Sequence, residues 1–156
     1  MNNYLKQHKI GFSIYGLIAF VLQEIPYLPW LLLPLANNPL ANNIPKNMYL
    51  GALEKFGGVL TVALLIMVIN KSLIHPKFNS RFFLVSAFCL ITYYICWIFY
   101  FSGFTNAWLI VIGLSAIVPI YYFFIALWLK NYFAIFTSII FFIGHTGSNI
   151  INFLMG

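Results

Sequence analysis

The sequence predicts an all-α integral membrane protein, a bundle of five transmembrane helices with a cytoplasmic N-terminus and the C-terminus outside. Of its 156 residues, 63% are hydrophobic and only 6% are charged, and the mean hydropathy is +0.95. A water-soluble domain of this length needs far more charge on its surface. Five apolar stretches alternate with short polar segments, and each is long enough to cross a hydrocarbon core of about 30 Å. Residues 1–156 are therefore predicted to form a single polytopic membrane domain.

The first predicted span, 11–33, follows an N-terminus that resembles a signal peptide. No small-x-small cleavage site follows the apolar run, so we expect the span to be retained. Three prolines come soon after Glu24: Pro26, Pro29 and Pro34. Proline lacks the amide donor and crowds the carbonyl four residues back, so the helix should kink or break just after Glu24. The carbonyls of Leu22 and Ile25 then lose their usual donors, and at membrane depth such backbone lies inside protein or lines a cavity.

The longest loop follows this span and contains a near-tandem repeat, ANNPL then ANNIP, at 36–45. Asparagine and proline favour turns over helix. Loops of this length can act as lids over a site.

The remaining four spans are predicted at 48–70, 82–101, 107–129 and 132–155. The turn between the third and fourth is short, so these two spans should be antiparallel neighbours. The fourth contains Pro119 near its middle. Cys89 and Cys96 lie seven residues apart in the third, about two helical turns, which is too far for a disulfide within one helix.

The basic residues predict the orientation. With the N-terminus inside, the cytoplasmic segments contain Lys6, Lys9, Lys71, Lys77, Arg81 and Lys130, and the outer segments contain Lys46 alone. This is the positive-inside pattern. The net charge of +6 is spread over membrane edges instead of one basic patch, which argues against nucleic acid as a partner. The expected location is the cytoplasmic membrane of a bacterium, and the lipid bilayer is the expected partner.

The chain contains two acidic residues, Glu24 and Glu54, and both fall inside predicted spans. A charge at membrane depth is costly and is tolerated where it faces protein, water or a partner charge. At a rise of about 1.5 Å per residue, Glu24, Glu54 and His145 all come out roughly 20 Å above the inner edge of the membrane. Together with Lys55, they are predicted to form one ionisable layer in the outer half of the bundle.

The helical positions next to Glu54 support an inward orientation. Gly51, Gly57 and Gly58 lie three or four residues away, on a face where another helix can approach closely. Each of the other spans also has one mildly polar face, and the simplest bundle turns these faces together. In the third span the face consists of Ser86, Cys89, Tyr93, Cys96 and Tyr100, and in the fifth of His145, Ser148, Asn149 and Asn152.

Structural roles account for several of these residues singly. Glu24 and Lys55 form a neutralising pair in one interpretation, and His145 is a hydrogen-bonding tie between helices in another. The set as a whole resists this explanation, because two acids and one lysine leave a net negative charge when His145 is neutral. Either one carboxyl is protonated or a cation lies in the layer.

The leading functional hypothesis is proton-coupled transport, or binding, of a small cation or cationic organic molecule. The candidate binding residues are Glu24, Glu54, Lys55, His145, Asn149, Tyr93 and Trp97. Aromatic faces at Trp30, Tyr93, Trp97 and Trp108 suit an organic cation. Five spans are few for a transport path, so a homodimer is expected.

Two alternatives belong to other classes. The first is an intramembrane enzyme or a metal-, haem- or lipid-binding protein, with Glu24, Glu54 and His145 as candidate metal ligands. No HExxH, paired-histidine or CxxC spacing is present, so the sequence favours a non-enzyme and identifies no cofactor. The second is an accessory or immunity-type subunit, which small size and short loops suit.

Overall fold

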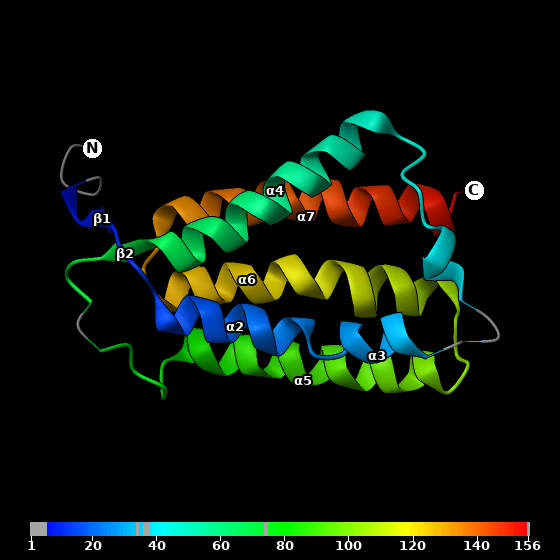
Figure 1. Ribbon diagram of the computed structural model, residues 1–156, viewed down its shortest axis with the longest axis horizontal. Coiled ribbons are helices and arrows are strands. Elements are labelled where there is room, and N and C mark those ends of the chain that lie inside the picture. The colour runs from blue at the N-terminus through cyan, green and yellow to red at the C-terminus, as the bar shows by residue number, and fades with distance from the viewer. Residues whose placement is uncertain (1–5, 34, 36–37, 74, 156) are drawn as a thin grey trace.

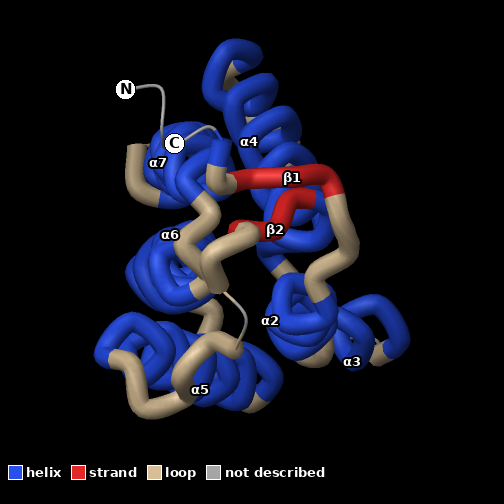
Figure 2. The backbone as a smooth tube through the Cα atoms, turned by 90° about the vertical axis from the view of Figure 1, so that its left-hand side faces the viewer, coloured by secondary structure: helices blue, strands red, loops and turns tan. Residues whose placement is uncertain are grey.

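The computed structural model is a bundle of helices with one short pair of strands at one end (Figures 1 and 2). It describes residues 6–33, 35, 38–73 and 75–155. Four helical segments in this part of the chain are long and apolar enough to cross a membrane. Three of them are α4 (Met48–Met67), α5 (Arg81–Phe101) and α7 (Tyr132–Phe153). The fourth consists of the π-helix η2 (Leu109–Ala116) and the α-helix α6 (Ile117–Trp128), which follows it directly. The chain is thus an all-helical integral membrane protein, as the sequence predicts.

The first predicted span is a broken helix. Helix α2 (Ile14–Glu24) ends at Glu24, and α3 (Tyr27–Leu32) resumes after Pro26, so the break lies where the prolines predict it. Helix α3 continues in the direction of α2 (Figure 1), but neither piece alone reaches the length of a membrane span. Pro34 and the start of the asparagine repeat, residues 36 and 37, lie outside the described residues.

Both carbonyls freed by the break have a donor. The Leu22 carbonyl, which would face Pro26, accepts from the Tyr94 hydroxyl at 2.5 Å. The Ile25 carbonyl accepts from the Leu28 amide at 3.3 Å. Helix α5 therefore satisfies the backbone at the break in α2, and the kinked segment is held against the bundle by a side chain 72 positions away.

Replacing Tyr94 with Phe should lower the free energy of unfolding by about 1 kcal/mol, the size of an inter-helix hydrogen bond in a membrane protein. The measurement is reversible unfolding by SDS in mixed micelles. Tyr49→Phe is the control, because its side chain is exposed at the start of α4 and its hydroxyl makes no hydrogen bond to a described residue. Equal losses in the two variants would contradict a role for Tyr94 at the break.

Helix α4 crosses the bundle obliquely, and glycines set its two closest contacts. Near its end it packs on α2, where a Cβ atom at Gly16 would lie 2.1 Å from the Leu65 carbonyl oxygen. Nearer its start it packs on α7, where a Cβ at Gly144 would lie 2.2 Å from the Glu54 amide nitrogen. Such contacts require glycine, because a side chain would overlap the facing backbone. In Figure 1, α4 accordingly diverges from α2 and α3 toward the end where it begins.

The fourth predicted span changes its helical pitch before Pro119. Residues Leu109–Ala116 form a π-helix, and α6 follows without interruption. Pro119 has no amide N–H to donate back into the preceding turn, and π-helical turns are often found at functional sites. Here the wider turn contributes Ile110, Leu114 and Ser115 to the interior of the bundle.

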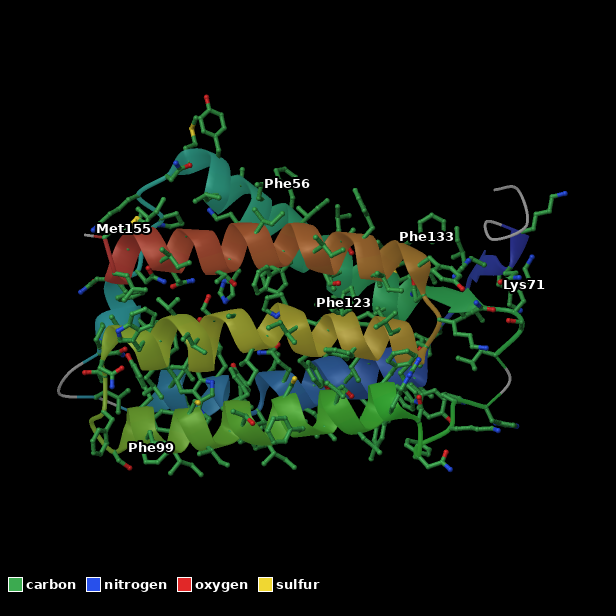
Figure 3. The ribbon with its side chains drawn as sticks, turned by 180° about the vertical axis from the view of Figure 1, so that it is seen from behind. Phe56, Lys71, Phe99, Phe123, Phe133 and Met155 are labelled. Atoms are coloured by element: carbon green, nitrogen blue, oxygen red, sulfur yellow. The ribbon has the colours of Figure 1, made fainter. Side chains whose placement is uncertain are left out.

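A two-stranded ribbon, β1 (His8–Ile10) and β2 (Val68–Asn70), closes one end of the bundle. The predicted helix over 68–70 is wrong, because α4 ends at Met67 and the residues that follow pair with β1. Lys71 lies at this end, whereas the opposite end carries Met155 (Figure 3). Lys6 and Lys130 also lie at the ribbon, where their backbone carbonyls accept hydrogen bonds from the side chains of Lys71 and Asn70.

The outer surface of the helices is apolar. Phe56 on α4 and Phe99 on α5 project away from the bundle (Figure 3). The other exposed apolar side chains include Val59, Leu60, Phe88, Ile91, Ile98 and Phe136. A continuous apolar surface of this extent suits lipid rather than water.

Candidate functional site

A cavity of about 720 Å³ lies inside the bundle, between the broken helix and α4. Its size falls in the range of about 300–1,000 Å³ that is typical of small-molecule sites. The residues that line it come from every helix of the bundle: Phe20, Gln23, Glu24, Tyr27, Trp30, Leu40, Asn43, Gly58, Val59, Val62, Ala63, Tyr93, Trp97, Ile110, Leu114, Ser115, Val118, Tyr122, Phe141, His145 and Asn149. Aromatic rings and apolar side chains dominate, with a few polar groups among them.

Glu24 is the acidic residue on the described cavity wall. It occupies the last position of α2, so the break in the helix brings its carboxylate to the cavity. The side chain is half-buried and lies near enough to the phenols of Tyr93 and Tyr122 to interact with them electrostatically. No lysine or arginine lines the described part of the cavity. The carboxylate thus faces a cavity without a permanent positive charge.

Gln23 forms the centre of a buried polar cluster beside Glu24. Its side-chain amide donates to the Tyr93 hydroxyl at 3.1 Å, and its carbonyl oxygen accepts from the Tyr122 hydroxyl at 2.6 Å. Gln23 is only 7% exposed. Gln23 was not among the predicted site residues, although an amide directly before an acid at a proline break in an apolar span is a usable signal. This cluster fixes the relative positions of α2, α5 and α6 at the cavity.

Glu54 pairs with His145 instead of Glu24 or Lys55. The Glu54 Oε1 and His145 Nδ1 atoms are 2.9 Å apart, and the side chains are 24% and 23% exposed. His145 lines the cavity, where its ring lies 5.0 Å from that of Phe141, but Glu54 does not. His145 is therefore part of the cavity wall, and Glu54 lies behind it, at the crossing of α4 and α7.

The predicted ionisable layer is only partly assembled in the structure. Glu54 and His145 meet, and Glu24 lies in the cavity. The Lys55 side chain is exposed, and no ion pair joins it to Glu24 in the part of the chain that the structure describes. The predicted neutralising pair of Glu24 and Lys55 is therefore not formed.

Asn149 connects the cavity to the long loop. Its amide nitrogen donates to the Ser115 hydroxyl at 3.1 Å and to the His145 carbonyl at 2.7 Å, and its oxygen accepts from Asn43 at 2.9 Å. Asn38, also in the loop, accepts from the Trp30 indole and the Tyr100 hydroxyl. The loop, with its short helix η1 (Pro39–Asn42), thus covers the end of the cavity opposite the ribbon.

Three of the four aromatic residues suggested for cation contact line the cavity, namely Trp30, Tyr93 and Trp97. The fourth, Trp108, is exposed on the outside of the bundle. The indole N–H of Trp97 is buried without a hydrogen-bond acceptor among the described residues; the Tyr93 hydroxyl is near it but outside hydrogen-bond geometry. An unsatisfied donor on a cavity wall is a position where a ligand can contribute an acceptor.

No group of three or more His, Cys, Asp or Glu side chains comes together for metal binding in the described ranges. Glu24 is thus not gathered with Glu54 and His145 in the way that the candidate metal site requires. The two cysteines, Cys89 and Cys96, are free thiols.

The chain matches no protein-family model, no curated protein sequence and no solved structure. The cavity and its residues are therefore the basis for assigning a function.

Proposed function

We propose that this protein binds a small organic cation in the membrane interior, with Glu24 as its counter-charge, and that it carries this cation in exchange for protons. The observation that supports the proposal best is a cavity of about 720 Å³ walled by aromatic rings, with one carboxylate and no described lysine or arginine. An inorganic ion would occupy a small fraction of that volume, whereas a drug-sized molecule fits it.

The wall chemistry matches a cation with an apolar body. Trp30 and Trp97 offer indole faces, which attract a cation by about 0.5–2 kcal/mol each when water is excluded. Glu24 supplies the full negative charge, and the Gln23 cluster holds Tyr93 beside it. The apolar residues from η2 and α4 surround the remainder of the ligand.

Proton exchange follows from the position of Glu24. A carboxyl group in the membrane interior is neutral when it holds either a proton or a cationic ligand. The two compete for the same oxygens, and this competition couples their movements.

In this proposal the broken α2–α3 segment makes a fifth crossing of the membrane. The lysines at the ribbon favour a cytoplasmic location for that end and the N-terminus, with the C-terminus outside.

Benzyltrimethylammonium, added to purified protein in lipid nanodiscs, tests the proposal. It should raise the thermal midpoint of unfolding, because a ligand at about 100 times its Kd stabilises by about 2.7 kcal/mol. The control ligand is neopentylbenzene, the neutral isostere with carbon in place of nitrogen. It should raise the midpoint much less, and the effect of the cation should decrease as the pH is lowered. Equal stabilisation by both ligands, or by neither, would contradict the proposal.

A further inference from the structure

The two ends of the cavity are closed by different devices. At the ribbon end, α2 and α4 are in backbone contact through Gly16 and Leu65. At the opposite end, the loop is joined to α7 by the hydrogen bond between Asn43 and Asn149. A ligand approaching along the bundle axis therefore meets helix backbone at one end and the hydrogen-bonded loop at the other.

The sides of the cavity are not equally closed. On the far wall, Tyr93 and Trp97 of α5 are 5% and 4% exposed, and Tyr122 of α6 is also buried. On the near wall, Tyr27 of α3 is 40% exposed and Val59 of α4 is 70% exposed, although both line the cavity. The cavity therefore reaches the outer surface between α3 and α4, along the face turned to the viewer in Figure 1.

This opening lies at membrane depth. Val59 is near the middle of α4, a helix long enough to cross the bilayer. Its neighbours Phe56 and Leu60 are exposed and apolar. The divergence of α4 from α3 follows from its glycine contacts with α7, at Gly57 and Gly144, so the opening is built into the packing of the helices. Hydrocarbon chains, and not water, are the medium outside it.

We propose that the cavity opens sideways into the bilayer between α3 and α4, and that its ligand is an amphiphilic amine. The cationic head lies at Glu24, among Tyr27, Trp30 and Trp97. An apolar chain leaves through the opening past Val59 and lies among the lipid tails. This inference rests on the proposed function, since it takes the head-group site from it and adds the route and the class of ligand. A head without a tail fits wholly inside the cavity, so its affinity does not depend on the opening.

The test compares two ligands and two variants in nanodiscs by equilibrium dialysis, with binding to empty nanodiscs subtracted. Decyltrimethylammonium carries a tail, and benzyltrimethylammonium does not. Val59→Trp fills the opening at an exposed position where the fold tolerates bulk, and Leu60→Trp, one residue along but not lining the cavity, is the matched control. We expect Val59→Trp to weaken the binding of decyltrimethylammonium by about tenfold or more, equivalent to about 1.4 kcal/mol. Leu60→Trp should bind both ligands with the wild-type affinity. Any loss of benzyltrimethylammonium binding in Val59→Trp should be much smaller than the loss of decyltrimethylammonium binding, because Val59 is a wall residue for the head but the exit of the tail.

The outcomes separate the two proposals. If benzyltrimethylammonium binds the wild type but Val59→Trp binds the tailed cation normally, or Leu60→Trp weakens it as much, the side opening is wrong and the cation site stands. If benzyltrimethylammonium fails to bind the wild type, the cation site itself is wrong, and this inference with it.

Discussion

Glu24→Gln should weaken the binding of benzyltrimethylammonium by about 30-fold, a loss of about 2 kcal/mol. Removing one partner of a desolvated charge pair typically costs about 2–5 kcal/mol, and the aromatic walls retain part of the attraction for the cation. Glutamine has nearly the same volume as glutamate and leaves the hydrogen bonds of Gln23 intact. The change thus removes the charge and little else. Equilibrium dialysis in nanodiscs measures the effect directly.

Glu54→Gln is the matched control, because it removes the other acidic side chain of the chain. Glu54 is not among the described residues of the cavity wall, and its hydrogen bond is to His145, which is. We therefore expect its replacement to change the affinity by less than about threefold. The pH dependence of binding should also fall in Glu24→Gln. Equal losses in the two Gln variants would show that the charge at Glu24 is not the specific counter-charge.

Much of the helical architecture is predictable because it follows from local chemistry. Lipid requires long apolar segments with internal hydrogen bonds, so α4, α5 and α7 begin within a residue of their predicted positions. The break after Glu24 follows from proline at 26, which removes a donor wherever the helix lies. The need for a new partner at the Leu22 carbonyl follows as well. Only the identity of that partner, Tyr94, requires the tertiary structure.

The composition of the site was less predictable, because depth estimates fix a residue's height but not its direction around the bundle. Glu24 and Glu54 were predicted at one level, yet only Glu24 lines the cavity. Lys55 follows Glu54 in sequence, and successive residues on a helix point about 100° apart, so an inward Glu54 turns Lys55 away. Gln23 was missed because an uncharged amide at membrane depth costs less than a carboxylate. Its position directly before Glu24 at the proline break was the available signal, and its phenolic partners require the tertiary structure.

A large loss of stability is expected at Gly144, where α7 lies directly against the backbone of α4. A Cβ atom there would lie 2.2 Å from the Glu54 amide nitrogen and 2.6 Å from the Leu53 carbonyl carbon. Backbone cannot rotate aside as a side chain can, so Gly144→Ala must separate the two helices. We expect a loss of about 3 kcal/mol, at the upper end of typical overpacking costs, measured by SDS unfolding in mixed micelles.

Gly147→Ala provides the control on the same helix, three residues along. Its Cβ would lie 3.3 Å from two methyl carbons of Leu50, which can move by a rotamer change, so the loss should stay within about 1 kcal/mol. Separation of α4 from α7 at Gly144 would also lengthen the Glu54–His145 contact and move Val59 relative to α3. Gly144→Ala should therefore alter the binding of decyltrimethylammonium as well as stability, whereas Gly147→Ala should alter neither strongly. Similar losses of stability in both variants would mean that the crossing point of α4 and α7 is not at Gly144.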